Sequence, residues 1–175
     1  MKLNLFVWNH DLSIKIPTVI RTATFDDFNQ TKAWQTNWTS RAAKAMPNKV
    51  ALCRKDDNEL LGLMSYEVDN CGLAVEVIYL ESAAHSNANL LHKGLEGKKY
   101  IGISHALFAH AVMVSMDAGF DGVLYFKAKT SRLREYYIKE FGAMPLSSFD
   151  PFRLAIWEDA AATLVQEFLV EEDSL

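Results

Sequence analysis

The stretch Lys98–Ser104 reads KKYIGIS, and it lies between an apolar run with the composition of a strand and an apolar run with the composition of a helix. A glycine leaves room for a ligand beside its backbone N–H. The first turn of a helix adds N–H groups without intrahelical partners and a partial positive charge. Two lysines supply countercharge. The stretch therefore has the composition of a phosphate-binding turn, although one glycine near two lysines is also typical of an ordinary solvated turn.

Three runs of strand-forming residues precede this turn. Val50–Arg54 and Leu60–Val68 are separated by an Asp-Asp-Asn turn, and a second turn at Asp69–Gly72 leads into Leu73–Ser82. Short connections between such runs are typical of hairpins, so we expect three consecutive antiparallel strands. The polar stretch 84–98 that follows is expected to be a long loop at the functional end of the sheet.

The residues after the turn predict alternating helices and strands. Residues 102–118 are apolar on nearly every face, which predicts a buried helix ended by Gly119. We then expect a strand over Gly122–Phe126, a helix over Arg132–Phe141, and a last strand over Phe152–Trp157 before a C-terminal helix.

The N-terminal region predicts strands and one long helix. Residues 3–8 and 14–22 are strand-like, and one of the two runs is expected to begin the sheet. Thr24 and Asp27 have the spacing of a capping box, and apolar residues then recur at intervals of three and four. We therefore expect a helix of about five turns that ends at Pro47.

Composition bounds the class of protein. The chain has 175 residues, of which 50% are apolar and 23% charged, as in a single globular domain. Its net charge of −4 argues against a general binder of nucleic acid or of a membrane surface. Cys53 and Cys71 lack metal-site spacing and are expected to be buried free thiols. No signal peptide or long apolar run is present, so a cytoplasmic protein is expected.

The order of these elements, and the residues at their joints, resemble the GNAT acyltransferase fold. That family has an acyl-CoA signature, R/Q-x-x-G-x-G/A. Residues 99–104, KYIGIS, match its glycine, with lysine at the leading position and serine at the last. The segments FKAKT at 126–130 and EYYIKEFG at 135–142 resemble the family's closing strand and helix. The resemblance covers residues 50–145. It implies an α+β fold with a mixed, mostly antiparallel central sheet flanked by helices on both faces.

The resemblance also implies how the chain is organised and what it binds. It implies one domain over residues 1–175: an acceptor-side region over 1–48, an acyl-CoA-binding core over 49–145, and a C-terminal strand and helix over 146–175. Acetyl-CoA is the expected co-substrate, and no metal is expected. The pyrophosphate of coenzyme A would bind at the turn, and its pantetheine arm would lie along the preceding strand. The residues implied in cofactor binding are Leu80, Glu81, Ser82, Lys99, Tyr100, Gly102, Ile103 and Ser104.

Two side chains are the candidates for acyl-transfer chemistry. Similar enzymes use a carboxylate as base and a tyrosine as acid, and Glu81 at a strand end and Tyr137 on the later helix are implied in these roles. Glu76 and Tyr136 are the second choices. Tyr137 lies one residue further from Gly142 than the family pattern has it. A solvated charge for Glu81 and plain packing for the tyrosines are the alternatives.

The sequence therefore predicts an acyl-CoA-dependent N-acyltransferase that moves acetyl from acetyl-CoA to the amine of an unknown acceptor, either a small molecule or a peptide. His85 and His92 in the polar loop could contact that acceptor. No nucleic acid and no membrane are expected as partners, and a homodimer is possible. The alternative is a non-catalytic protein of this fold that binds coenzyme A as an effector or serves as an interaction module.

Overall fold

The computed structural model describes residues 2–91 and 97–170 of the chain. They form two compact units, each described by itself. The N-terminal unit contains residues 4–65, 79–91 and 97–107, and the C-terminal unit contains residues 2–3, 66–78 and 108–170. The prediction of a single domain stays a prediction, and His92 lies outside the described residues.

The N-terminal unit is built on strands in the order β6-β1-β2-β3-β4-β5. The pairs β1/β2, β1/β6, β2/β3 and β3/β4 are antiparallel. The three strands predicted before the glycine turn are confirmed as β3, β4 and β5, and both N-terminal runs are strands. The bounds are β1 Phe6–Asn9, β2 Ile14–Thr22, β3 Lys49–Arg54, β4 Leu60–Asp69, β5 Ala74–Ser82 and β6 Tyr100–Ile101.

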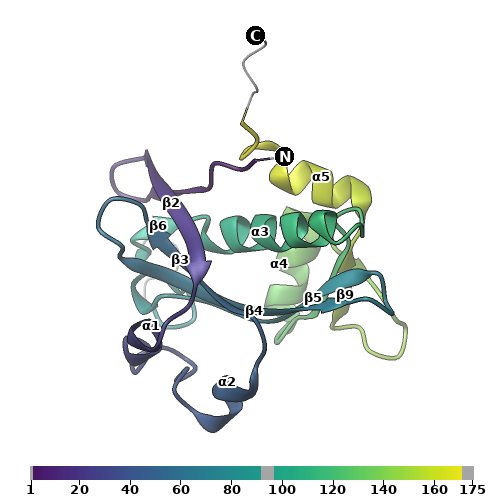
Figure 1. The fold of residues 1–175 in the computed structure, drawn as a ribbon, viewed down its shortest axis with the longest axis horizontal. Helices are drawn as coiled ribbons and strands as arrows, with labels where there is room; N and C mark the ends of the chain where they lie inside the picture. The colour runs from purple at the N-terminus through teal and green to yellow at the C-terminus, as the bar shows by residue number, and fades with distance from the viewer. Residues whose placement is uncertain (1, 92–96, 171–175) are drawn as a thin grey trace. The chain divides into compact units, whose positions relative to one another are not determined.

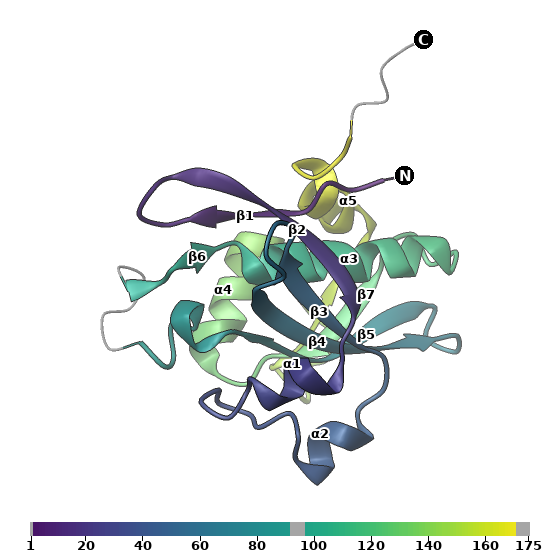
Figure 2. The ribbon, with the colours of Figure 1, turned by 60° about the vertical axis from the view of Figure 1, so that its left-hand side comes forward.

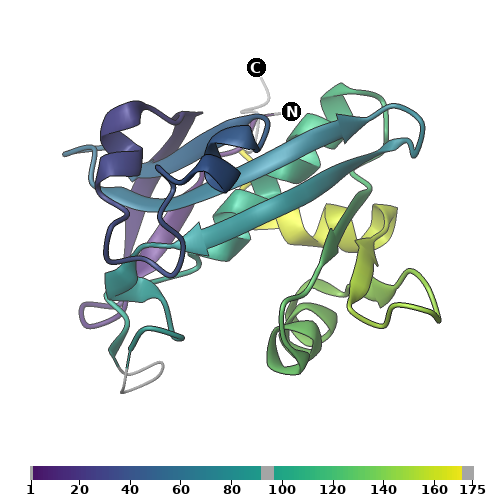
Figure 3. The ribbon, with the colours of Figure 1, turned by 90° about the horizontal axis from the view of Figure 1, so that it is seen from below.

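Helices lie on both faces of this part of the sheet (Figure 1). Helices α1 and α2 cover one face, where Trp38, Ala43 and Leu63 belong to one buried cluster (Figure 3). The start of α3 covers the other face. A Cβ atom on Gly62 of β4 would lie 2.8 Å from Ile103 Cγ2, so this helix packs directly on the strand backbone.

The predicted five-turn helix is wrong. The chain forms two short helices instead, α1 Phe25–Asn29 and α2 Arg41–Ala45. The capping box of Thr24 and Asp27 is present at the start of α1. After it, Thr31 Oγ1 donates to the Phe28 carbonyl and accepts from Trp38 N–H, so the backbone is drawn into a turn. The apolar residues whose spacing suggested one helix are buried instead by the packing of this turn on the sheet.

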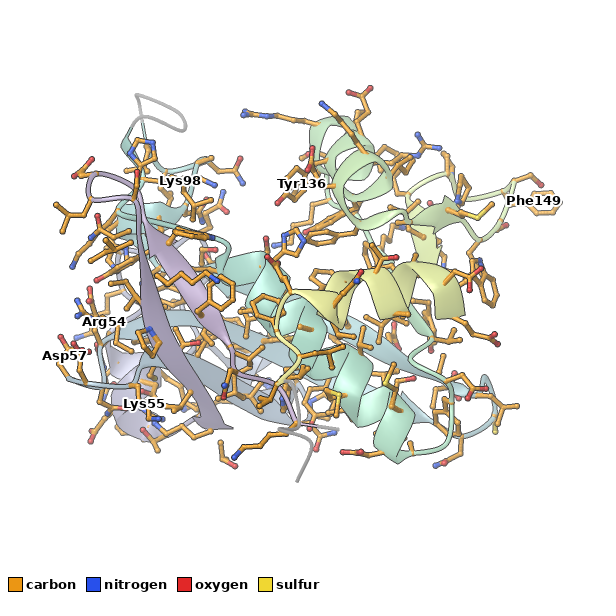
Figure 4. All side chains as sticks on the ribbon, turned by 90° about the horizontal axis from the view of Figure 1, so that it is seen from above. Arg54, Lys55, Asp57, Lys98, Tyr136 and Phe149 are labelled. Atoms are coloured by element: carbon orange, nitrogen blue, oxygen red, sulfur yellow. The ribbon has the colours of Figure 1, made fainter. Side chains whose placement is uncertain are left out.

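The C-terminal unit orders its strands β4-β5-β7-β9-β8. β5 pairs in parallel with β7, while β7/β9 and β8/β9 are antiparallel, so the sheet is mixed and mostly antiparallel, and the α+β class is confirmed. Phe149, which is 98% exposed, points away from the loop between β8 and β9 (Figure 4). The bounds are β7 Leu124–Lys127, β8 Met144–Pro145, β9 Arg153–Ile156, α4 Ser131–Phe141 and α5 Glu158–Gln166, and α3 spans Ile103–Asp117.

The predicted end signals of two helices are confirmed. Gly119 follows α3 with φ +82°, and Phe120 N–H donates to the Ser115 carbonyl. Thr130 caps α4, and Gly142 ends it in the left-handed conformation. Of the two cysteines, Cys53 is buried as expected, but the expectation for Cys71 is wrong, because it is exposed in the turn between β4 and β5.

Candidate functional site

The glycine turn is more regular than the sequence predicts. Tyr100–Ile101 forms the short strand β6, which pairs with Asn9 and Trp8 of β1 (Figure 2). Lys99 is held from both sides, since its N–H donates to the His85 carbonyl and its carbonyl accepts from His10 N–H. The segment before Gly102 is therefore a fixed element rather than a free loop.

Gly102 itself leaves its surroundings open. Its φ is +95°, a conformation that favours glycine, and no atom lies within 4 Å of the place where a Cβ would stand. α3 begins at the next residue, and Ala106 N–H donates to the Gly102 carbonyl. The N–H groups of Ile103 and Ser104 belong to the first turn of a 15-residue helix. An open glycine followed by a helix N-terminus is the backbone arrangement that binds phosphate.

The side chains of Lys99 and Tyr100 are engaged with Glu59, at the start of the hairpin strand β4. Lys99 Nζ lies 2.8 Å from Glu59 Oε1, and the buried Tyr100 hydroxyl donates to Oε2 at 2.7 Å. The hydrogen bond to Glu59 raises the pKa of Lys99. Burial raises the pKa of Glu59, but the bonds from Lys99 and Tyr100 outweigh it, and the pKa lies below its usual value.

Arg54 extends this network. Its guanidinium donates to the Tyr100 hydroxyl at 3.0 Å and to Asp56 at 2.6 Å, at the turn where Figure 4 labels Arg54 and Asp57. Sequence reasoning missed the network, because Glu59 and Lys99 are 40 positions apart and read as separate surface charges.

Glu81 lies near the end of β5 with 3% of its surface exposed. Its carboxylate accepts hydrogen bonds from three groups: Gln35 N–H at 2.6 Å, Thr36 N–H at 3.3 Å and the Trp38 indole N–H at 3.1 Å. Both oxygens are therefore occupied by donors from the segment between α1 and α2. This arrangement ties that segment to the strand end, next to Leu80 and Ser82.

Tyr137 lies on α4 of the C-terminal unit, among the rings of Phe108, Phe126 and Phe141. Burial raises the pKa of its hydroxyl to about 12, so the phenol is neutral at physiological pH. Among the described residues no group forms a hydrogen bond with that hydroxyl. Tyr136 is the more exposed of the two, with 40% of its surface accessible.

Glu76, the second choice for the base, is engaged elsewhere in the C-terminal unit. Its Oε2 accepts from the Tyr125 hydroxyl at 3.3 Å, and the same hydroxyl donates to Asp69 at 2.9 Å. Each of the two units thus holds one of the predicted catalytic residues, Glu81 and Tyr137, and their assignment to catalysis stays a prediction.

Metal-ligand clusters and membrane-spanning helices are both absent from residues 2–91 and 97–170. In this part of the chain, no group of three or more His, Cys, Asp or Glu side chains is arranged to hold a metal ion. No helix there has the length and apolar character needed to cross a membrane.

The fold matches solved structures, among them a GNAT-family acetyltransferase. No protein family model matches the sequence, and no curated protein matches it. A chain of the KacTA–DNA complex is 16% identical over 86% of this chain and 99% of its own, with a TM-score of 0.56. AtaTR bound with acetyl-CoA is 18% identical over 84% and 97%, with a TM-score of 0.55. A GNAT-family acetyltransferase from Listeria monocytogenes is 9% identical over 80% and 94%, with a TM-score of 0.52. The chain therefore has the GNAT fold, as the resemblance implied.

These structures correct one prediction. Nucleic acid was excluded as a partner on the ground of net charge, and that exclusion is wrong, because KacTA and the AtaT–AtaR complex were both solved on DNA. Net charge is a sum over the whole surface. It does not report whether a chain joins a nucleic-acid assembly through a local patch or through a partner protein that supplies the basic surface.

Proposed function

We propose that the protein is an acyl-CoA-dependent N-acetyltransferase that binds acetyl-CoA with its pyrophosphate at Gly102 and the first turn of α3. The observation that carries the proposal is the open, positive-φ glycine at the start of a long helix in a chain of the GNAT fold. The AtaT structures with acetyl-CoA support it, since that ligand is bound by a protein of the same fold. Lys99 adds positive charge beside the turn while it remains paired with Glu59.

The roles of the cofactor's other parts are proposed from the same fold. The pantetheine arm would take main-chain hydrogen bonds at Leu80–Ser82, the end of β5. Tyr137 is proposed as the acid that protonates the leaving thiolate, because its phenol is neutral and its hydroxyl is not used by the described residues. Tyrosine-to-phenylalanine mutants of AtaT and KacT are among the matched structures.

Titration calorimetry with acetyl-CoA tests the cofactor site. Gly102→Ala places a Cβ in the open space beside the turn, so we expect binding to weaken at least about tenfold, because the ligand can no longer approach the backbone closely. The strain of the left-handed conformation, about 1–2 kcal/mol, is present with and without ligand. Gly119→Ala is the matched control, because Gly119 also has a positive φ, +82°, and no atom within 4 Å of its Cβ position. Equal affinities of the two variants, or no binding to the unmodified protein at millimolar acetyl-CoA, would refute the proposed site.

The second candidate is a GNAT-fold protein that binds acetyl-CoA without transferring it. Glu81 favours it, because a buried carboxylate that accepts bonds from Gln35, Thr36 and Trp38 has little capacity left to activate an amine. Release of free thiol from acetyl-CoA, measured against a panel of amines, separates the two functions. Tyr137→Phe is expected to abolish release in an enzyme, and the absence of release from the unmodified protein supports the binder.

A protein partner is also proposed, on the basis of the matched structures. AtaT is described as a toxin, and its mutant was solved with the C-terminus of the antitoxin AtaR. We infer that this chain also has a protein partner, through which it joins a nucleic-acid assembly. Affinity purification of the tagged chain from its source cells, with and without nuclease, tests this. A chain recovered alone under both conditions contradicts it.

A further inference from the structure

The N-terminal unit contains a cavity of about 360 Å³, which is within the size range of small-molecule sites. Its walls come from the segment after α1, the start of β4 and the residues that follow β5. The apolar part of the lining includes Trp34, Leu60, Ala83 and Ala84, and the polar part includes Glu59 and His85. We call it the Trp34 pocket.

The walls of the Trp34 pocket are fixed. Trp34 N–H donates to the Thr31 carbonyl, and the next residue, Gln35, donates its N–H to the buried Glu81 carboxylate. Trp34 also packs on the buried cluster that contains Trp38. Ala83, another lining residue, donates its N–H to the Leu61 carbonyl. Apolar surface on a fixed frame can bind a ligand without first being ordered by it.

The polar groups of the pocket carry little net charge. Glu59 is neutralised by Lys99, whose ammonium lies 2.8 Å from Oε1. Burial lowers the pKa of His85, against a smaller opposing effect of Glu59, so its imidazole is neutral. A charged group entering this pocket would lose its hydration without gaining an unpaired countercharge, whereas a neutral apolar group has no such hydration to lose.

The ring of His85 lies between the Ser86 hydroxyl and the carboxylate of Glu59. Ser86 Oγ accepts from Tyr100 N–H at 3.0 Å, so the hydrogen of its own hydroxyl is available to His85 Nδ1, which lies 2.7 Å away. The other ring nitrogen, Nε2, lies 3.4 Å from Glu59 Oε1. The polar groups at the edge of the pocket are therefore hydrogen-bonded or paired with each other. They define the shape of the pocket and add little net charge to it.

The chain places the pocket beside the proposed thioester site. Ala83 and Ala84 directly follow Leu80–Ser82, where the pantetheine arm is proposed to lie, and one residue of extended chain spans only about 3.3 Å. A group held against Ala84 is thus one or two residues away from the end of β5. An amine separated from its apolar group by two to three bonds would fit that interval.

We propose that the Trp34 pocket takes the neutral apolar group of the acetyl acceptor, so that the protein selects primary amines with a branched aliphatic or aromatic group over hydroxylated or doubly charged amines of similar length. This inference rests on the proposed acetyl transfer. It names the part of the acceptor that the N-terminal unit recognises, and it assigns Trp34, Leu60, Ala83 and Ala84 to specificity rather than to chemistry.

Protein-observed NMR tests the pocket without turnover. The indole N–H signal of Trp34, assigned by its loss in Trp34→Phe, is followed during titration with isopentylamine, 2-phenylethylamine, 4-amino-1-butanol and cadaverine. We expect saturable chemical-shift changes with the two apolar amines. We expect at least about tenfold weaker binding of the hydroxylated amine and the diamine, because a hydroxyl or a second charge replaces apolar surface that would be buried. Equal effects of all four amines would overturn the proposal.

Two variants locate the binding. Ala84→Leu fills the pocket and is expected to abolish the Trp34 shifts, while Ala162→Leu, at an exposed alanine of α5, is the matched control and is expected to retain them. Ala33→Trp, at an exposed position of the same lining, serves if Ala84→Leu does not fold. An unchanged titration in the folded filled variant would place the amines elsewhere and overturn the proposal.

Thiol release from acetyl-CoA with the same amines completes the test. We expect kcat/KM to follow the order of the NMR affinities and to fall in the filled variants with apolar amines only. If no amine gives thiol release while the Trp34 titration is as expected, the proposed enzymatic function fails and the pocket's selectivity for apolar groups stands. If release occurs with no preference among the amines, the enzymatic function stands and the inference about the pocket fails.

Discussion

At the scale of residues, one buried carboxylate organises the segment between α1 and α2. Glu81 accepts from two partly buried backbone N–H groups and from the buried indole N–H of Trp38. Leaving a buried donor without an acceptor costs about 1–3 kcal/mol. The geometry therefore supports a positioning role for Glu81, whereas the base implied by the family resemblance needs an oxygen free for the substrate.

Glu81→Gln distinguishes these roles. The amide keeps one acceptor oxygen but turns a donor NH2 toward either Gln35 N–H or the Trp38 indole N–H, which bond to different oxygens of Glu81, so the free energy of unfolding in urea is expected to fall by about 1–3 kcal/mol. Glu67→Gln, at an exposed position of β4, is the control and is expected to change it by less than about 0.5 kcal/mol. Loss of acetyl transfer at unchanged stability would instead identify Glu81 as a base.

At the scale of elements, the segment from α1 to α2 shows how tertiary contacts divide a predicted helix. Its spacing of apolar residues suits a helix, yet Gln35 and Thr36 donate their N–H groups to Glu81, 46 and 45 positions away, rather than to a helical carbonyl. Thr31, fully buried, closes the turn between Phe28 and Trp38. The segment contains β-branched residues and Asn, which have modest helix propensity, so little free energy is lost when it leaves the helical conformation.

Thr31→Val tests the turn. Valine has the shape of threonine without the hydroxyl, so the buried Trp38 N–H loses its acceptor and the Phe28 carbonyl loses a donor. We expect a destabilisation of about 1–3 kcal/mol in urea and a change in the near-ultraviolet circular dichroism of Trp38. Thr31→Ser keeps the hydroxyl and is expected to retain the spectrum. A Thr31→Val protein as stable as the serine variant would contradict this account.

At the scale of the whole molecule, the GNAT fold persists with very little shared sequence. The matched structures are 9–19% identical over at least 80% of this chain. The order of the strands and the placement of the helices depend on the pattern of apolar residues and on a few positions with special backbone conformations. Many different sequences meet these requirements. The acceptor and the partners depend on particular side chains, which such a match does not carry over.

The stability of the whole chain at high pH reports the burial of Tyr137. Its pKa is raised to about 12, above the unfolded value near 10, so the unfolded chain loses this proton first. Between pH 10 and 12 the unfolded state binds fewer protons than the native state, and stability is therefore expected to fall as pH rises, by up to about 3 kcal/mol. Below pH 10 this group makes no pH-dependent contribution.

The measurement is urea unfolding from pH 8 to 11, compared between the unmodified protein and Tyr137→Phe. The variant should lose less stability above pH 10, because the other alkaline groups, including Cys53 with its pKa raised to about 11 by burial, are common to both proteins. Parallel pH profiles would contradict a buried neutral phenol at this position.

By itself the sequence determined those parts of the molecule that short-range chemistry controls. Turn residues and alternation predicted β3, β4 and β5, apolar composition predicted α3, and capping residues predicted the start of α1 and the ends of α4. The glycine turn was found in the same way, since a glycine next to two lysines and just before a predicted helix is a local signal of a phosphate-binding turn. These signals act over a few neighbouring positions, so they can be read along the chain.

Only the tertiary structure decided what depends on residues far apart in the chain. It divided the predicted helix between α1 and α2, turned Tyr100–Ile101 into a strand beside β1, and surrounded Glu81 with donors. It also brought Glu59, which is paired with Lys99, and His85 together beside Trp34, where they line a pocket that no spacing predicts. A buried polar group without a hydrogen-bond partner destabilises the fold. Such groups therefore pair with whichever residues the fold brings near them, at any distance in sequence.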